Sequence, residues 1–327
     1  MSAQREDSIP HELRTAAEPR QNRLYPVRLS HVEQVNPSVR LLQLAIPENN
    51  SDQQSFAFLP GQWLDVHIPS IAHAGGFTIT STPADAQVLP ALEAAAESAP
   101  GEETSPSIES QGRPPYVELA VQDSPGNPSA AWFWRPQQEI LGQELNIRVG
   151  GSFIWPPTGL NLADIQNVVF IAGGPSHLHP LSSQHSTHSP PQHPFPILQP
   201  PPPGHDKITS LETTLDQILF LPRLRQIIRS QLHSHRLRIA LDLFLTNTDA
   251  SSRLISTESP ADLTIHPKRI TAHDLRSAVV GGDGQADPRG TVCYVCGPPS
   301  MTDEMVELLN EILGEAAEQR IFFEKWW

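Results

Sequence analysis

Residues 290–301 constrain the fold of this chain more than any other segment. A short run of β-branched and aromatic residues stops at Gly297-Pro298-Pro299, and apolar residues then recur at helical spacing as far as Ile312. This pattern predicts a buried strand that leads directly into a helix over residues 300–313. Ligands of open α/β sheets bind beside the carboxyl ends of the strands, so this junction is a candidate binding site.

Two local features refine the junction. Ser300 and Asp303 have the spacing of a capping box at the start of the helix. Cys293 and Cys296 have the spacing of a redox dithiol, but residues three apart on a strand point to opposite faces. We therefore expect two separate thiols, with Cys296 near the carboxyl end of the strand.

The first half of the chain alternates apolar and polar residues, as Val27, Leu29, Val39 and Leu41 illustrate. Strands are predicted at residues 25–33, 38–46, 63–68, 77–81, 116–122 and 141–149, with a short helix at 131–134. Six short strands and one helix fit an antiparallel β-barrel over residues 23–160.

The second half has a different pattern. Residues 168–172 form a continuous apolar run, typical of a parallel strand buried on both faces, and residues 237–246 form a second. Helical patterns lie at residues 208–232, 271–279 and 300–313. This alternation predicts a Rossmann-like parallel α/β domain over residues 165–327.

Three segments lack the composition of a folded core. We predict a disordered leader at residues 1–22, a disordered acidic insert at 84–112 and a Pro/His-rich insert at 175–206. The histidines of the last insert are His177, His179, His185, His188, His193 and His205. No helix or strand fixes their geometry there, so the segment predicts solvated side chains and no metal site.

The charge and hydropathy of the chain exclude two classes of partner. The net charge of -14 argues against nucleic acid and anionic membranes, because both select for clustered Lys and Arg. No apolar run approaches the roughly 18 residues of a membrane-spanning helix.

The N-terminus lacks the apolar core of a secretory signal, and its acidic residues argue against a transit peptide. We expect a cytoplasmic protein, with a mitochondrial location as the alternative.

Four motifs in this order resemble the ferredoxin-NADP reductase superfamily and, within it, small proteins with an oxidoreductase NAD-binding domain. They are Gly75-Gly76-Phe77-Thr78-Ile79, Ile171-Ala172-Gly173-Gly174, Cys296-Gly297-Pro298-Pro299 with Met301, and Phe322-Phe323-Glu324-Lys325-Trp326-Trp327. The resemblance covers the chain from residue 24 onward, apart from the two inserts. It implies an FAD-binding barrel followed by an NAD(P)-binding domain. Hydride would pass from NAD(P)H to the flavin and on to an unknown small-molecule or protein acceptor.

On the flavin side, the resemblance implies that Phe77 packs on the flavin and that the Thr78 hydroxyl bonds near the reacting nitrogen, which makes Thr78 a catalytic candidate. Gly75 stands where the family has an arginine. The loss of that charge-assisted phosphate contact predicts weaker flavin binding. The alternative is that this strand only fills the core.

Two further segments carry flavin contacts in the resemblance. The turn from Gly126 to Ser129 would cradle the flavin diphosphate at a helix start that Ser129 can cap, or else would be an ordinary capped turn. Trp326 and Trp327 would stack on the flavin ring, or else would seal the interface between the domains.

On the nicotinamide side, Gly173 and Gly174 match the start of the dinucleotide loop, while Ser176 stands where a third glycine is expected. Cys296 matches a catalytic-site cysteine beside the nicotinamide, where its role is contact and positioning. Gly297, Pro298, Pro299 and Met301 complete this motif. The alternative for Cys296 is a small buried residue at a strand end.

The sequence therefore predicts an FAD-dependent NAD(P)H oxidoreductase. The alternatives are a non-catalytic cofactor-binding protein that keeps the fold, favoured by the departures at Gly75 and Ser176, and a scaffold that acts through the proline run at residues 200–203.

Overall fold

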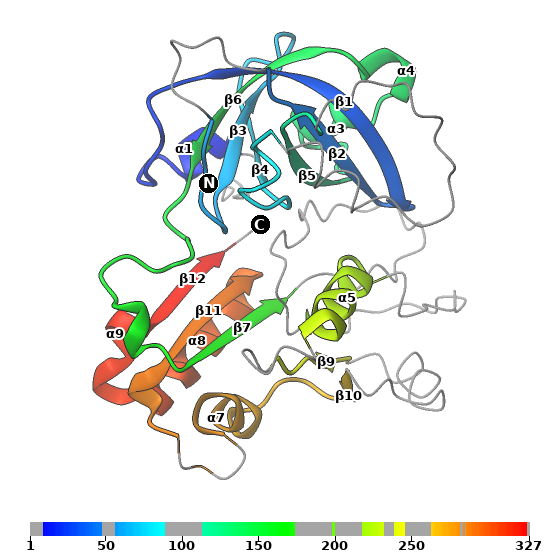
Figure 1. The fold of residues 1–327 in the computed structure, drawn as a ribbon. Helices are drawn as coiled ribbons and strands as arrows, with labels where there is room; N and C mark the ends of the chain where they lie inside the picture. Colours follow the sequence, from blue (N-terminus) through cyan, green and yellow to red (C-terminus); the bar gives the residue numbers. More distant parts are fainter. Residues whose placement is uncertain are drawn as a thin grey trace, which may run out of the picture. The chain divides into compact units, whose positions relative to one another are not determined.

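The structure, a computed structural model, describes the chain in segments. These are residues 9–47, 56–88, 113–173, 198–199, 218–231, 239–245, 263–281, 284 and 286–325, with 198–199 described by their backbone alone. The chain divides into two compact units between Trp155 and Pro156 (Figure 1). Each unit has its own sheet and its own buried core.

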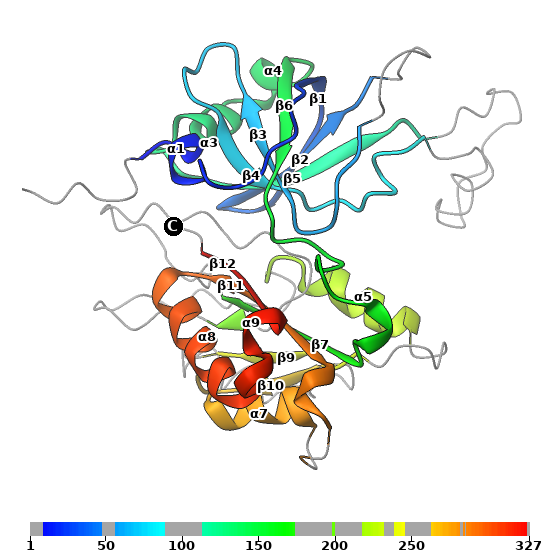
Figure 2. The ribbon, with the colours of Figure 1, turned by 90° about the vertical axis from the view of Figure 1, so that its left-hand side faces the viewer.

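The first unit is an antiparallel sheet of six strands in the order β4-β3-β6-β1-β2-β5. The strands are β1 (Tyr25–Asn36), β2 (Val39–Ala45), β3 (Trp63–His67), β4 (Gly75–Thr78), β5 (Tyr116–Gln122) and β6 (Glu144–Gly150). The edge strands β4 and β5 meet at an isolated bridge between Ile79 and Leu119, and Figure 2 shows the curled sheet. The predicted antiparallel six-stranded class is confirmed, but this single bridge leaves the barrel open between β4 and β5.

Alternation along the strands explains which side chains fill the barrel. Inward-facing residues such as Leu29, Leu64 and Ile147 are fully buried. α3 (Pro128–Phe133) adds Phe133 to the same core, and α4 (Gln137–Ile140) adds Ile140. The short helix predicted at 131–134 is thus present, but it begins three residues earlier, at Pro128.

The chain before β1 is also part of the first unit, and we call residues 9–21 the N-terminal arm. It contains α1 (His11–Arg14), and Arg20 forms an antiparallel bridge with Gly150. Gln21 donates its backbone N–H to the Val149 carbonyl at 2.9 Å. The predicted disordered leader was therefore wrong for residues 9–22, because composition alone does not reveal the buried carboxylate that binds the arm.

The second unit is a parallel sheet of six strands in the order β10-β9-β8-β7-β11-β12. The strands are β7 (Asn167–Gly173), β8 (Leu198–Gln199), β9 (Asp242–Phe244), β10 (Thr264–His266), β11 (Thr291–Gly297) and β12 (Ile321–Lys325). Its described α-helices are α5 (Leu221–Gln231), α7 (Ala272–Val280), α8 (Pro299–Leu313) and α9 (Ala317–Arg320). The predicted Rossmann-like parallel class is confirmed.

Helices pack on both faces of this parallel sheet. Val169 and Val295 lie in a buried cluster with residues of α7 and α8, whereas Leu243 lies in a second cluster with Leu224 and Ile228 of α5. β11 is buried at every position, as its continuous apolar run predicts for a central strand.

Sequence patterns missed the short strands β8, β10 and β12, which lack a long apolar run. β8 lies within the predicted Pro/His-rich insert. The strand predicted at 237–246 and the helix predicted at 208–232 appear as the shorter β9 and α5, and several of their remaining residues lie outside the described part. Of the predicted disordered segments, residues 1–8, 89–112, 175–197 and 200–206 also lie outside it. The prediction was wrong for residues 84–88 of the acidic insert, where Ala86 is buried and Asp85 accepts a hydrogen bond from Arg113 at 2.8 Å. No helix in the described ranges has the length and apolar character needed to span a membrane.

Candidate functional site

The carboxyl ends of three neighbouring strands meet beside the start of α8. Gly297 ends β11 and pairs with Lys325 at the end of β12, while Gly173 ends β7 on the other side of β11. α8 begins at Pro299, two residues after β11 ends. The strand–helix junction predicted from the sequence is therefore present at the edge of the sheet where ligands of such folds bind.

The start of α8 is capped differently from the prediction. Its N-cap residue is Pro298, so Ser300 lies inside the first turn, and the capping box predicted for Ser300 and Asp303 was wrong. Thr302 donates its backbone N–H to the Pro298 carbonyl at 2.9 Å and its hydroxyl to the Gly297 carbonyl at 3.1 Å. Helix geometry leaves other first-turn N–H groups without intrahelical acceptors, and the helix dipole favours an anion there. The first turn of α8 can therefore bind a phosphate group.

Met301 fills the space beside the two glycines of this edge. A Cβ atom on Gly173 would overlap the Met301 sulfur, and one on Gly297 would come within 2.8 Å of the Met301 methyl carbon. Glycine at both positions therefore lets Met301 lie there. We call the space beside Gly173 and Gly297 the glycine cradle. The end of the unbranched, adaptable Met301 side chain fills it, so a ligand can reach the glycines when Met301 rotates away.

Cys296 is a buried thiol at the same edge. It is 5% exposed and pairs across the ladder with Glu324 of β12. Burial first, and the Glu324 carboxylate second, raise the pKa of Cys296 well above its ordinary value. Because the thiolate is the nucleophile, this neutral thiol is suited to contact rather than covalent attack.

Cys293 does not form a redox pair with Cys296. It lies in the buried cluster with α7 and α8, and burial raises the pKa of its thiol to about 12. Both cysteines are free and buried. The expectation of two separate thiols agrees with this arrangement.

On the barrel, the residues predicted to hold the flavin diphosphate bond and pack within the protein itself. Ser129 lies against β4, so that a Cβ atom on Gly75 would come within 2.5 Å of the Ser129 Cβ. Ser129 was predicted to cap α3, but the cap is Asn127. The side-chain oxygen of Asn127 accepts hydrogen bonds from the backbone N–H groups of Ser129 (3.1 Å) and Ala130 (3.3 Å). Gly126 lies in the exposed turn before this cap. Two of the amides at the start of α3 that could bind a diphosphate are thus already bonded.

Phe77 and Thr78 face opposite sides of β4, because side chains alternate along a strand. Phe77 is 4% exposed, and its ring meets Phe133 edge to face at 5.5 Å in the barrel core. The predicted packing of Phe77 on a flavin therefore differs from the structure, in which it is a core residue. Thr78 is half-buried and pairs across the ladder with Trp63 of β3.

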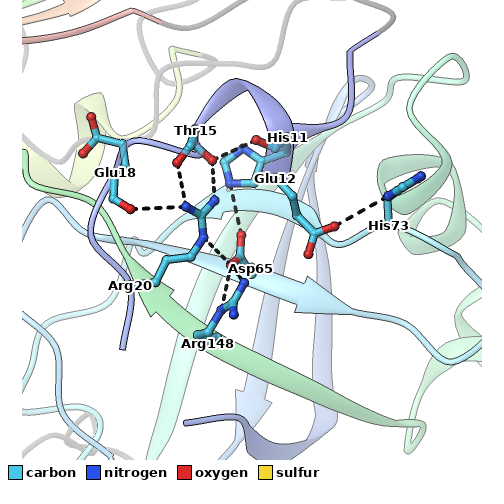
Figure 3. A network of polar contacts seen from close by, with 8 residues as sticks. All are labelled: His11, Glu12, Thr15, Glu18, Arg20, Asp65, His73 and Arg148. Atoms are coloured by element: carbon cyan, nitrogen blue, oxygen red, sulfur yellow. Dashed lines mark hydrogen bonds and ion pairs between the residues drawn. The ribbon is translucent and has the colours of Figure 1, made fainter. Parts of the chain in front are cut away.

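A charged network lies on the outer face of β3 and β6, centred on Asp65 (Figure 3). Asp65 is fully buried, and its carboxylate accepts hydrogen bonds from Arg20 Nε (2.9 Å) and Arg148 Nη2 (2.7 Å). His11 Nε2 lies 3.3 Å from the other carboxylate oxygen. Burial by itself raises the pKa of Asp65, but the contacts with His11, Arg20 and Arg148 outweigh it and hold the pKa far below its ordinary value. The buried carboxylate is therefore ionised at neutral pH.

The N-terminal arm supplies His11 and Arg20 to this network. The His11 ring meets the Trp63 ring edge to face at 4.6 Å, and the Arg20 guanidinium lies over the same indole at 4.8 Å. Arg20 also donates to the Thr15 carbonyl at 2.6 Å. The His11 ring lies against Gly76, where a Cβ atom would overlap it. The arm thus covers the Gly76 side of β4.

Sequence reasoning missed both the Asp65 network and the Asn127 cap, although each left a signal. Asp65 stands between Leu64 and Val66, and a buried carboxylate in an apolar strand needs charged partners. Asn127 directly before Pro128 is the usual pair of an N-cap residue and a first helical proline.

Several predicted residues cannot be placed. Gly174, Trp326 and Trp327 lie outside the described residues, as do the histidines of the Pro/His-rich insert. Within the described segments, no group of three or more His, Cys, Asp or Glu side chains could hold a metal ion.

Comparison with known proteins relates the whole chain to one set of relatives. No family model matches it. "Oxidoreductase NAD-binding domain-containing protein 1" of Xenopus tropicalis is 27% identical, over 100% of this chain and 86% of the relative. The chain resembles these oxidoreductase NAD-binding domain-containing proteins. Those of Danio rerio and Homo sapiens are each 26% identical over 97% of this chain, and the alignments cover 97% and 84% of their own lengths. The resemblance predicted from the motifs is confirmed.

Two solved structures give weaker likenesses. A cytochrome P450 reductase of Amycolatopsis matches 94% of this chain and 70% of its own at 14% identity, with a TM-score of 0.49. A ferredoxin NADP+ reductase of Neisseria gonorrhoeae with bound FAD and NADP matches 93% of this chain and 99% of its own at 15% identity, with a TM-score of 0.48.

Proposed function

We propose that this chain is an NAD(P)H-dependent oxidoreductase that transfers hydride from nicotinamide to FAD and on to a small-molecule or protein acceptor. The junction of β11 and α8 carries the proposal, because glycines, a neutral thiol and a helix start converge there at the carboxyl edge of a parallel sheet. The name that the curated relatives bear, an oxidoreductase with an NAD-binding domain, supports the same class of reaction.

The nicotinamide nucleotide would bind to the second unit. Gly173 and Gly297 would allow its backbone to approach closely once Met301 has moved, and the first turn of α8 would bind a phosphate. Cys296 would lie beside the nicotinamide as a neutral thiol that positions the ring. Gly174, Pro298 and Pro299 would complete the contact surface.

FAD would accept the hydride and supply the redox chemistry on the barrel side. The described barrel residues fit this group only in part. Thr78 offers a half-buried hydroxyl on β4, but Phe77 is packed in the core, and Gly126 and Ser129 belong to a turn whose amides Asn127 already binds. Trp326 and Trp327 stay proposed contacts of the flavin ring.

A binding protein without turnover is the second candidate. The side chain of Ser129 against Gly75 and that of Met301 against Gly173 favour it, because each lies where a cofactor phosphate is expected. A cytoplasmic location is proposed for either function, and fluorescence imaging of the tagged chain tests it.

An anaerobic reduction experiment separates the two functions. The purified protein is mixed with FAD and then with NADH or NADPH while the flavin absorbance is followed. We expect the absorbance to be bleached and to return when an oxidant is added. Nucleotide that quenches the protein fluorescence without bleaching the flavin would support the binding protein and contradict the enzyme.

A further inference from the structure

We propose that α3 and the N-terminal arm cover β4, and that the barrel therefore binds flavin without binding its phosphates. The inference rests on the proposed function and adds the class of flavin: riboflavin, FMN and FAD should be equivalent, dissociable ligands. It follows from what lies against Gly75 and Gly76, the first two positions of the motif in which the family resemblance places the phosphate-binding arginine.

The Gly75 face of β4 is closed by α3. Ser129 lies so near that even a Cβ atom on Gly75 would be 2.5 Å from the Ser129 Cβ and 2.8 Å from its hydroxyl oxygen. A long cationic side chain at Gly75 therefore has no room. The start of α3 offers no replacement, because Asn127 accepts the N–H groups of Ser129 and Ala130.

The Gly76 face of β4 is closed by the N-terminal arm. The His11 ring lies where a Cβ atom on Gly76 would be, and its edge meets the Trp63 ring. The arm is held there by Arg20, which bonds the buried carboxylate of Asp65 opposite Gly76 on the neighbouring strand. Glycine at both positions is thus explained by the protein's own packing.

Among the described residues, the two arginines of this face, Arg20 and Arg148, are already bonded. Figure 3 shows Arg20 and Arg148 converging on the Asp65 carboxylate, with Arg20 also bonded to the Thr15 and Glu18 carbonyls. A flavin phosphate would have to compete for these guanidinium groups with a buried carboxylate of the same charge sign. The phosphates of FMN and FAD should therefore add no affinity over riboflavin.

A comparison of three flavins tests this. The purified full-length protein, freed of flavin, is titrated separately with riboflavin, FMN and FAD, and the dissociation constants are obtained from the quenching of flavin fluorescence. We expect the three constants to agree within about threefold, whereas one charge-assisted phosphate contact would separate them by about tenfold or more. FAD that binds more than about tenfold tighter than riboflavin, or that stays bound through gel filtration, overturns the inference.

The titration also separates failure of this inference from failure of the proposed function. Preferential FAD binding overturns the inference and leaves the flavin-dependent reaction standing. Absence of binding by all three flavins overturns both.

A double variant supplies a matched comparison. Gly75→Arg with Ser129→Gly restores the arginine and removes the nearer of the two side chains, Ser129 and Phe77, that a Cβ atom there would meet. Gly75→Met with Ser129→Gly has similar length and no charge. We expect the preference for FAD over riboflavin to rise about tenfold in the first variant alone. An equal preference in both would contradict the explanation, and if neither variant folds, the titration of the natural chain still decides.

Discussion

Two pairs of glycines, one in each unit, stand where the family resemblance places cofactor contacts, and the protein's own side chains fill both. On β4, Ser129 of α3 lies against Gly75, beside Phe77 of the same strand, and His11 of the arm lies against Gly76. Ser129 and His11 are each fixed by other bonds, in the capped start of α3 and in the arm that Asp65 anchors.

At the parallel sheet, by contrast, one side chain fills the cradle of Gly173 and Gly297. Met301 reaches both glycines with the end of its thioether, and it is bound there by packing alone. The comparison teaches that a glycine motif does not by itself indicate an accessible ligand site. What matters is whether the group beside the glycine can leave at low cost, which favours the sheet over β4.

The largest effect should follow from removing the anchor of the arm. Asp65→Ala leaves Arg20 and Arg148 as unpaired, largely buried cations. We expect the free energy of unfolding of the first unit to fall by about 3–5 kcal/mol. Urea unfolding followed by tryptophan fluorescence measures this loss.

An exposed ion pair provides the control for Asp65→Ala. Lys325 Nζ and Asp303 Oδ1 lie 2.6 Å apart, but the Asp303 side chain is 64% exposed, so Asp303→Ala should cost less than about 1 kcal/mol. Equal losses in the two variants would contradict the role of Asp65 as an anchor. Because the pKa of Asp65 is lowered in the folded state, its contribution is present above pH ~4 and is lost as the pH falls further. The difference in the free energy of unfolding between the natural chain and Asp65→Ala should therefore become smaller as the pH falls below about 4.

Alanine at single glycines tests the two cradles directly. Gly76→Ala forces a methyl group into the His11 ring, which the arm holds in place, and should cost about 1–3 kcal/mol of stability. Gly173→Ala meets the movable end of Met301 and should cost less than about 1 kcal/mol. Thermal unfolding of the two variants gives the comparison, and a larger loss for Gly173→Ala would reverse the assignment of fixed and movable neighbours.

Much of the fold could be predicted from the sequence, because hydrophobic periodicity reports burial. The alternation around Val27 and Leu29 marked the barrel, and the continuous apolar runs of β7 and β11 marked a parallel sheet. The arm could not be predicted in this way. Its polar composition is that of a leader, and it is held by charges brought together from β3 and β6 by folding, such as Arg148 opposite Asp65.

The candidate site was predictable where it is local in sequence and not where it depends on packing. Cys296, Gly297 and Met301 lie within six residues, and the structure brings them to one sheet edge with Gly173. The inward orientation of Phe77 depends on the register of β4 with β3, which no local pattern reports.

A smaller effect should follow from emptying the movable cradle. Met301→Ala removes the side chain that a nucleotide must displace, so we expect NADH or NADPH to bind about threefold to tenfold more tightly, because no side chain has to be rearranged on binding. Val306→Ala, on the same helix and packed against the same core, serves as the control and should leave binding unchanged. Isothermal titration of the three proteins measures the dissociation constants. Weaker binding in Met301→Ala would mean that the thioether contacts the nucleotide instead of blocking it.

The smallest effect should come from the thiol beside the movable cradle. Burial and Glu324 raise the pKa of Cys296, so at neutral pH it is a protonated group that occupies volume and lends no charge. Cys296→Ala should therefore change the rate of flavin reduction by less than about tenfold, because it removes one contact of the nicotinamide and no reacting group. Native protein should also react slowly with iodoacetamide, and denatured protein rapidly. Fast native labelling that bound nucleotide blocks would instead mean a reactive thiolate, and the cradle would then hold a nucleophile in addition to the side chain that fills it.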